Sequence, residues 1–216
     1  MPSVRSIVGM YRSDTSTKRF QKEGTVAKRS GVLEFAVLGL LHESPMHGYE
    51  LRKRLNLVLG SFRAFSYGTL YPCLKGLVAC GWIVEDRPVV EPRGLETNRR
   101  SKIVYKLTPA GEARFRSLLA DAGPSAWEDE NFGVHFAFFA RTDAAIRLRI
   151  LEGRRSRLEE RLDLIRQQVT KTRERIDGYT LELQRHGLES VEREVRWLNE
   201  LIQTEHDQQQ VGPPAS

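Results

Sequence analysis

The segment SYGTLYPCLKGLVACGWI, from Ser66 to Ile83, carries the clearest fold signals in this chain. Ser66 is a good N-cap residue for a helix, and Gly81 suits the left-handed conformation that commonly ends one. Between them, apolar side chains recur at helical spacing, at Leu70, Leu74, Leu77 and Val78. We therefore expect a helix with one buried face, closed at Gly81 and followed directly by a strand.

Pro72 leaves the start of this helix open. If Ser66 caps the helix, Pro72 falls in its interior, where the missing N–H and the ring clash normally kink a helix. The sequence favours a regular helix that begins near Tyr71. Residues 66–70 would then form a preceding turn or a short helical lead-in.

Two further helices are expected upstream. The first has apolar residues three and four apart, at Leu33, Ala36, Val37, Leu40 and Leu41. The segment 43–48 ends it, because Pro45 disfavours helical backbone at Ser44. The second has its apolar positions at Tyr49, Leu51, Leu55 and Val58, and is expected to end near Gly60.

A hairpin is expected downstream of the helix that Gly81 closes. Residues 82–85 and 103–107 read as its two strands. The tip between them is long and polar and carries the basic cluster Arg99, Arg100 and Lys102. Thr108 can cap a following helix, with Pro109 at its first position. This order of parts predicts a winged helix-turn-helix, in a chain that is mainly α with a small β-hairpin wing.

The carboxy-terminal part is expected to be helical and coiled-coil-like. Residues 121–131 break the pattern, and Asp143 can cap a long helix. Gly187 is expected to separate that helix from a last one. A heptad-like seam runs along both helices, and we assign dimerisation to Leu151, Leu158, Leu162, Ile165, Val169, Ile176, Val195 and Leu198. The alternative is that the two helices pack within their own chain.

Composition sets the organisation of the chain. Residues 1–30 carry 7 basic and 2 acidic side chains and few large apolar ones, which favours a disordered extension. A DNA-following arm and a downstream translation start are the alternatives. We expect a winged-helix domain at 31–120, a helical dimerisation and effector domain at 132–207, and a disordered tail at 208–216. The basic first half, with a mildly acidic second half, suits a polyanion-binding module joined to another region.

Several function classes are excluded or disfavoured. No apolar run is long enough for a membrane helix, and no secretory signal is recognised, so we expect a cytoplasmic location and no membrane partner. The chain has two cysteines, Cys73 and Cys80, which we expect to be small core residues. No cofactor or metal set is predicted, because neither CxxC nor HxxxH occurs. No motif of a hydrolase, zinc protease or nucleotide-binding enzyme is present either.

The start of the 66–80 helix and the wing carry the groups that could touch nucleic acid. Only the start of such a helix reaches base edges, so small and polar groups are needed there. We assign DNA binding to Tyr49, Ser66, Tyr67, Gly68, Thr69, Tyr71, Lys75, Arg99, Arg100 and Lys102. The alternatives are that Tyr67 and Tyr71 pack on the neighbouring helices and that the wing cations lie in a solvated loop. Arg52, Lys53 and Arg54 on the second expected helix are weaker candidates for DNA contact, because some of them must face solvent.

Other polar and aromatic residues favour structural roles. His47, beside Gly48 in a turn, is expected to be a hydrogen-bonded structural residue rather than a metal ligand. Trp127, Trp197 and Tyr179 could line an apolar effector pocket, but packing in a core or an interface is the favoured interpretation.

Four segments, in order, resemble the PadR family of transcriptional regulators. His47-Gly-Tyr-Glu-Leu51 looks like the family's second-helix opening, and Ser66-x-Gly-Thr-Leu-Tyr-Pro72 its recognition segment. Gly81-Trp-Ile83 and Tyr105-x-Leu-Thr108-x-x-Gly111 look like the helix exit and the second wing strand. The family's acidic residue after Leu77 is replaced by Val78 and Ala79. The long helical region is similar to the larger PadR subclass, where it mediates dimerisation.

The resemblance implies a homodimer that binds double-stranded DNA at a pseudo-palindromic operator. We expect a repressor rather than an activator, with release by a small-molecule effector of unknown identity as a further hypothesis. The rival hypothesis is a winged-helix protein-interaction scaffold with only non-specific DNA affinity.

Overall fold

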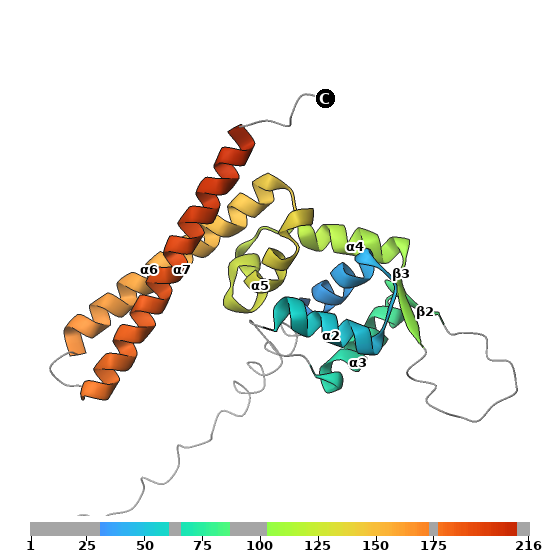
Figure 1. The fold of residues 1–216 in the computed structure, drawn as a ribbon, viewed down its shortest axis with the longest axis horizontal. Helices are drawn as coiled ribbons and strands as arrows, with labels where there is room; N and C mark the ends of the chain where they lie inside the picture. The colour runs from blue at the N-terminus through green and yellow to red at the C-terminus, as the bar shows by residue number, and fades with distance from the viewer. Residues whose placement is uncertain (1–30, 61–65, 87–102, 173–176, 211–216) are drawn as a thin grey trace, which may run out of the picture.

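The computed structural model describes residues 31–60, 66–86, 103–172 and 177–210, and two packed regions follow one another along them (Figure 1). The winged-helix region comes first, and a hairpin of two long helices comes last. Helix α5 (Asp129–Ala137) lies between them. Three predicted features lie outside the described residues: the amino-terminal extension at 1–30, the wing tip with its cations, and the end of the tail at 211–216.

The winged-helix region is built around the helical segment 31–43, which is buried on almost every side. Helices α2 (Gly48–Leu59), α3 (Tyr67–Ala79) and α4 (Pro109–Leu119) pack around it. Each presents an apolar stripe to the common core, as in Leu51, Leu55 and Leu59 of α2. The predicted helices and their order are confirmed.

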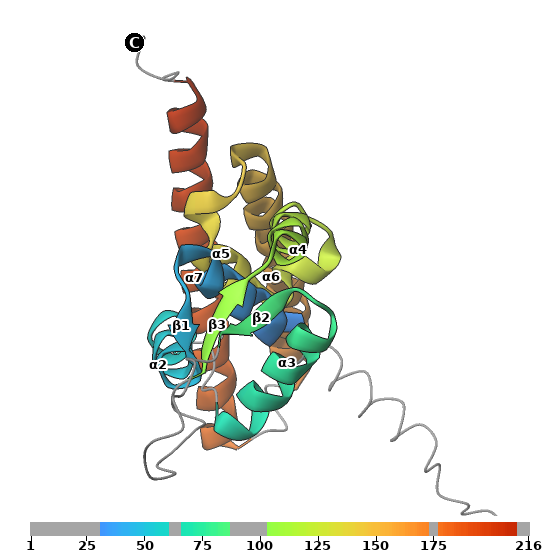
Figure 2. The same ribbon diagram turned by 90° about the vertical axis from the view of Figure 1, so that its right-hand side faces the viewer.

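A small antiparallel sheet closes this region (Figure 2). Its order is β1-β3-β2, with β1 at Met46–His47, β2 at Ile83–Asp86 and β3 at Val104–Leu107. Ile83 pairs with Leu107, and Met46 pairs with Tyr105. The sequence predicted the hairpin of β2 and β3 but missed β1, because two residues are too few for any alternating pattern.

The predicted turns around β2 and α4 are confirmed. Gly81 has φ of 72°, and the N–H groups of Gly81 and Trp82 donate to the carbonyls of Val78 and Leu77, which ends α3 in a Schellman motif. The Thr108 hydroxyl accepts from the Gly111 N–H at 3.0 Å and donates to the Gly81 carbonyl at 2.7 Å. One cap therefore joins the start of α4 to the end of α3.

The favoured start of α3 near Tyr71 was wrong. The helix begins at Tyr67 and contains Pro72. The N–H groups of Thr69 and Leu70 donate to the Ser66 carbonyl at 3.3 and 3.1 Å, which forms the first turn. Pro72 cannot donate to the carbonyl of Gly68, but Gly68 is exposed, so water can satisfy that oxygen.

The carboxy-terminal region contains two short 3₁₀ turns, η2 (Pro124–Trp127) and η3 (Phe139–Arg141), around α5, followed by α6 (Ala144–Thr172) and α7 (Gly178–Gln210). Asp143 caps α6 as predicted, accepting from the Ala145 N–H at 2.9 Å. The predicted break at Gly187 was wrong, because α7 runs through it. The cost of one helical glycine is only about 1 kcal/mol, whereas Asp177 accepts from the N–H groups of Tyr179 and Thr180 and so starts α7 earlier.

Helix α5 belongs to both cores. Its Val134, with Phe138 just beyond its end, packs in the winged-helix core, whereas Phe132 packs against the helical hairpin. Gly39 is required by this arrangement, since a methyl group there would overlap the Phe138 ring. Helix α7 continues to Gln210, past the expected start of the tail at residue 208. None of the helices that the structure describes contains an apolar stretch that could span a lipid bilayer.

Candidate nucleic-acid interface

The start of α3 presents small polar groups on its outer side. Ser66, Gly68 and Thr69 are exposed, and Lys75 is exposed two turns further along. Leu70, Leu74 and Leu77 anchor the opposite face in the core. The Thr69 hydroxyl donates to the Ser66 carbonyl at 3.0 Å, which holds the first turn in place. The side chain of Tyr67 lies outside what the structure describes.

Two tyrosines differ in their environment beside this turn. Tyr71 is half-buried and packs against the winged-helix core. Its ring lies beside Gly48 at the start of α2, where an added methyl group would make only an ordinary contact, 3.6 Å from the Tyr71 hydroxyl. Tyr49, at the start of α2, is 65% exposed. The packing alternative therefore accounts for the ring of Tyr71, whereas Tyr49 is free of the core.

The sheet ties the start of α2 to the base of the wing. His47 Nδ1 lies 3.1 Å from the Ile103 carbonyl oxygen, at hydrogen-bond distance. This confirms the prediction of a hydrogen-bonded structural histidine. Because β1 also pairs with β3, Tyr49 is held in a fixed relation to the strand that leaves the wing. The sequence did not predict that residues 46–47 pair with the strand that leaves the wing. The only signal for it was a histidine directly before a glycine, at His47 and Gly48.

The cations of the interface fall into two groups. Among the described residues, Lys75 has no acidic side chain within ion-pair distance, whereas Arg54 of α2 is paired with Glu43 at 3.6 Å and Glu50 at 3.2 Å. Lys106 in β3 is paired with Asp86 at 2.5 Å. Arg99, Arg100 and Lys102 lie outside the described residues, so their position relative to α3 stays a prediction.

Cys73 lies on α3 away from the exposed polar groups, and burial raises the pKa of its thiol to about 12. It is therefore an inert core thiol at neutral pH. Cys80 is exposed, in contrast to the expected core position, because it follows the last turn of α3. Within the described ranges, no group of three or more His, Cys, Asp or Glu side chains could hold a metal ion.

The residues assigned to dimerisation are largely covered by their own chain. Leu151, Leu158, Leu162 and Leu198 are buried where α6 packs against α7. Ile165 and Val195 are half-buried, and the side chains of Val169 and Ile176 lie outside the described residues. Packing within the chain accounts for this burial, so a role for these positions between two copies stays a prediction.

The three aromatic residues considered for an effector pocket are dispersed. Trp127 packs over Gly153 of α6. Trp197 of α7 contacts the rings of Phe132 and Phe136, with ring centroids 6.2 and 5.2 Å away. Tyr179 is 92% exposed at the opposite end of α7. The arrangement does not bring them together, and the first two serve packing.

Residues 37–117 match the model of the transcriptional regulator PadR-like family. The negative transcriptional regulator PadR of Bacillus subtilis (strain 168) is 32% identical to the chain over 88 residues. That match covers 41% of this chain and 45% of the relative, so it spans less than half of the relative's length.

Three solved structures are similar to this one at low identity. B. subtilis PadR in complex with operator DNA is 21% identical over 81% of this chain and 99% of that chain, with a TM-score of 0.38. The same protein in complex with p-coumaric acid is 21% identical over 81% of this chain and 99% of that chain, with a TM-score of 0.37. The PadR-like regulator BC1756 from Bacillus cereus is 20% identical over 82% of this chain and 99% of that chain, with a TM-score of 0.35.

Proposed function

We propose that the chain is a PadR-like transcriptional regulator, a sequence-specific DNA-binding repressor that acts as a homodimer, because residues 37–117 match the model of that family. The observation that carries the proposal is the exposed polar start of α3, with Ser66, Gly68, Thr69 and Lys75 directed away from the core. The B. subtilis relative is named a negative regulator, which supports repression over activation.

In this proposal α3 enters the major groove with its first turn. The exposed hydroxyls of Ser66 and Thr69 can donate to or accept from base edges. Gly68 lets the backbone approach a phosphate closely, and the N–H groups at the helix start favour an anion. Lys75 and Tyr49 flank this turn and reach phosphates. Arg99, Arg100 and Lys102 add contacts from the wing to phosphate or to the minor groove.

A second copy of the chain supplies a second winged-helix region, so that the dimer has two DNA-reading heads. Tyr179 and Leu183, one turn apart on α7, are 92% and 71% exposed, and Leu164 on α6 is exposed as well. Large apolar side chains in this state favour burial against a partner. Two copies related by a two-fold axis would read half-sites about one helical turn apart, or a multiple of that.

A small-molecule effector completes the proposal as a release mechanism. B. subtilis PadR has been solved with p-coumaric acid. For this chain we propose only that the effector is a small molecule, without naming the compound. A ligand that changes the packing between the helical hairpin and α5 would turn the reading heads relative to each other. Operator affinity would fall through lost register rather than through lost contacts.

The test replaces Lys75, Arg99 and Arg100 by alanine in one variant. The matched control replaces Arg149, Arg193 and Arg196, which are exposed on α6 and α7, and so removes the same charge. The first variant is expected to lose about 100-fold in operator affinity, with a salt dependence shallower by about one ion per lost phosphate contact. Equal losses in both variants would leave only a basic protein with non-specific affinity, as the scaffold hypothesis predicts.

A further inference from the structure

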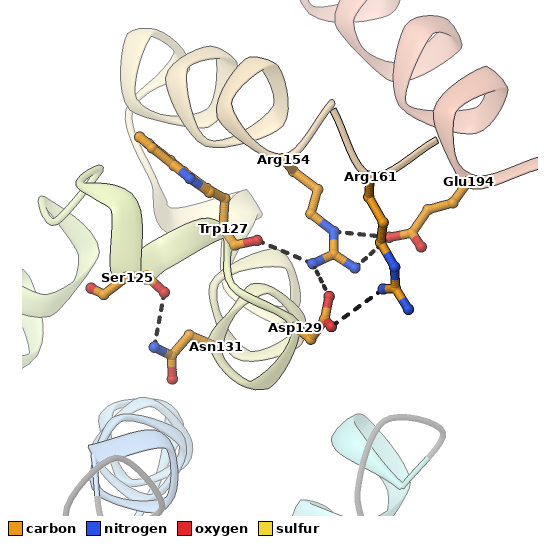
Figure 3. A network of polar contacts seen from close by, with 7 residues as sticks. All are labelled: Ser125, Trp127, Asp129, Asn131, Arg154, Arg161 and Glu194. Carbon is orange, nitrogen blue, oxygen red and sulfur yellow. Dashed lines mark hydrogen bonds and ion pairs between the residues drawn. The ribbon is translucent and has the colours of Figure 1, made fainter. Parts of the chain in front are cut away.

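Arg154 is a charged residue buried in the middle of α6, with its side chain only 8% exposed. Its Nη1 donates to the Trp127 carbonyl at 3.1 Å and to Asp129 at 2.5 Å. Its Nε and Nη2 donate to Glu194 at 2.9 and 2.8 Å. Figure 3 shows one guanidinium group at the meeting point of these partners.

The partners come from different parts of the fold. Trp127 ends η2 and Asp129 begins α5, whereas Glu194 lies on α7. A guanidinium group is planar and rigid, so bonds on both of its edges fix direction as well as distance. Its carbon also lies 5.2 Å from the centre of the Phe132 ring of α5. Arg154 therefore joins α5 to both helices of the hairpin.

Helix α5 carries this link into the winged-helix region. Val134 and Phe138 pack in the same core as Leu70 and Leu74 of α3. Phe138 fits against Gly39, which has no space for a larger side chain. A change in the angle between α5 and the hairpin is therefore a change in the angle between α3 and the hairpin.

Further contacts around Arg154 hold α5 firmly against the helical hairpin, and we call this contact region the joint. The Asn131 amide donates to the Ser125 carbonyl at 2.8 Å and closes the turn between η2 and α5. The Trp127 ring lies directly over Gly153. A separate ion pair between Arg141 and Glu43, at 3.2 Å, joins η3 to the end of the helical segment 31–43.

We propose that Arg154 is a positioning residue that sets the angle between the helical hairpin and the winged helix, and so the spacing of DNA half-sites that the dimer accepts. The inference rests on the proposed function, because spacing has meaning only for two reading heads on one duplex. Arg154 itself contacts no DNA in this scheme. It acts through α5 on the direction of α3.

The test compares Arg154→Met with Arg147→Met. Arg147 forms an equally close pair with Glu205, at 2.6 and 2.8 Å. It also donates to the carbonyls of Phe139 and Thr142, which follow α5 in the chain, but not to α5 itself. Asp129→Ala is a second test variant, for use if Arg154→Met does not fold. It removes the exposed carboxylate on α5, which pairs with Arg154 and, at 3.8 Å, with Arg161. Arg154 keeps its bonds to Glu194 and to the Trp127 carbonyl.

The probe is a duplex that the wild-type protein enriches from a random-sequence library, together with versions carrying one extra base pair between the half-sites. Wild type and Arg147→Met are expected to lose roughly 30-fold in affinity on that insertion, since a stiff dimer cannot engage both half-sites. Arg154→Met and Asp129→Ala are expected to lose under about 3-fold, because a loose joint restores both contacts. Circular dichroism and sedimentation check the fold and the dimer.

The two failures are distinguishable. If the wild type enriches no duplex, the proposed function is overturned and this inference with it. If the wild type discriminates the insertion and both test variants discriminate it equally, the proposed function stands and the role of Arg154 is overturned.

Discussion

The winged-helix region and the helical hairpin bury their apolar residues in different ways. In the first, the segment 31–43 is surrounded by helices and sheet, and the turn into α4 is closed by a local hydrogen bond of Thr108. In the second, a single seam between α6 and α7 is buried, and Arg–carboxylate pairs flank it. Tyr179 and Leu183 stay outside that seam.

The core around segment 31–43 is enclosed within one chain, whereas in the proposed dimer a second copy would cover the exposed end of the hairpin. The hairpin leaves large apolar side chains in water, where burying each would contribute about 1.5–3 kcal/mol. We therefore expect substitutions in the first region to act on stability, and substitutions at the exposed end of the second to act on association.

The largest expected effect comes from the same leucine deletion made in both cores. Leu74→Ala should cost about 3–4 kcal/mol of unfolding free energy, because rigid neighbours surround the cavity. Leu162→Ala should cost about 2 kcal/mol, since two helices can close part of the gap. Urea denaturation of both variants measures the difference. A larger cost at Leu162 would contradict the comparison.

The next effect is a loss of stability in acid that arises from a histidine packed against the winged-helix core. Burial lowers the pKa of His135 to about 4, and its ring packs on Phe35 with centroids 4.9 Å apart. An unfolded histidine titrates near 6.5, so between these values the unfolded chain binds a proton that the folded chain excludes. Stability should therefore fall as the pH drops from about 6.5 towards 4, by roughly 2 kcal/mol at pH 4.5 from this group.

His135→Phe keeps a ring at this position and removes the titration. Its free energy of unfolding should fall less than that of the wild type between pH 7 and pH 4.5. Parallel acid dependence in the two proteins would assign the loss to carboxylates elsewhere.

A smaller effect should distinguish association from stability. Replacing Tyr179 and Leu183 together by serine should weaken the dimer by about 10- to 100-fold, with little change in the unfolding of the separated chain. Sedimentation equilibrium measures the dissociation constant. Leu57→Ser on α2 is the matched control, since Leu57 is also strongly exposed. An unchanged dimer in the double variant would place the interface elsewhere.

The smallest effects concern the helix caps of the two regions. Thr108→Ala should cost about 1 kcal/mol at any pH, through the lost bond to the Gly111 N–H. Asp177→Ala should cost less, because this cap is exposed. Hydrogen bonds from Thr180 lower the pKa of Asp177 below its ordinary value near 3.8. Its stabilisation is therefore full at neutral pH and lost as the pH falls through the lowered value, which unfolding at pH 7 and pH 3 would measure.

Local chemistry explains what the sequence could predict. Gly81, Thr108 and Asp143 each act on backbone within a few residues, and all three behave as expected. The start at Pro72 and the break at Gly187 were misplaced for related reasons. A helical glycine costs only about 1 kcal/mol, and the larger cost of Pro72 is reduced because the carbonyl of the exposed Gly68 can bond to water. The packing of Leu70 and Leu74 in the core, or of Val191 and Leu198 in the seam, offsets what remains.

The site was predicted less completely than the fold. The exposed positions of Ser66, Gly68, Thr69 and Lys75 follow from the stripe of leucines opposite them. The tie from His47 to Ile103 and the burial of Arg154 depend on contacts between distant segments, which periodicity does not encode. The heptad seam had the right spacing, but spacing cannot say which helix covers it.

The most direct test is binding of the protein to the DNA just upstream of its own gene. A mobility shift at two salt concentrations, with unrelated DNA as competitor, separates sequence reading from charge. We predict tight binding that survives the competitor, with a complex of two chains per site. Binding that any DNA removes equally at both salt concentrations would contradict sequence-specific regulation at this site.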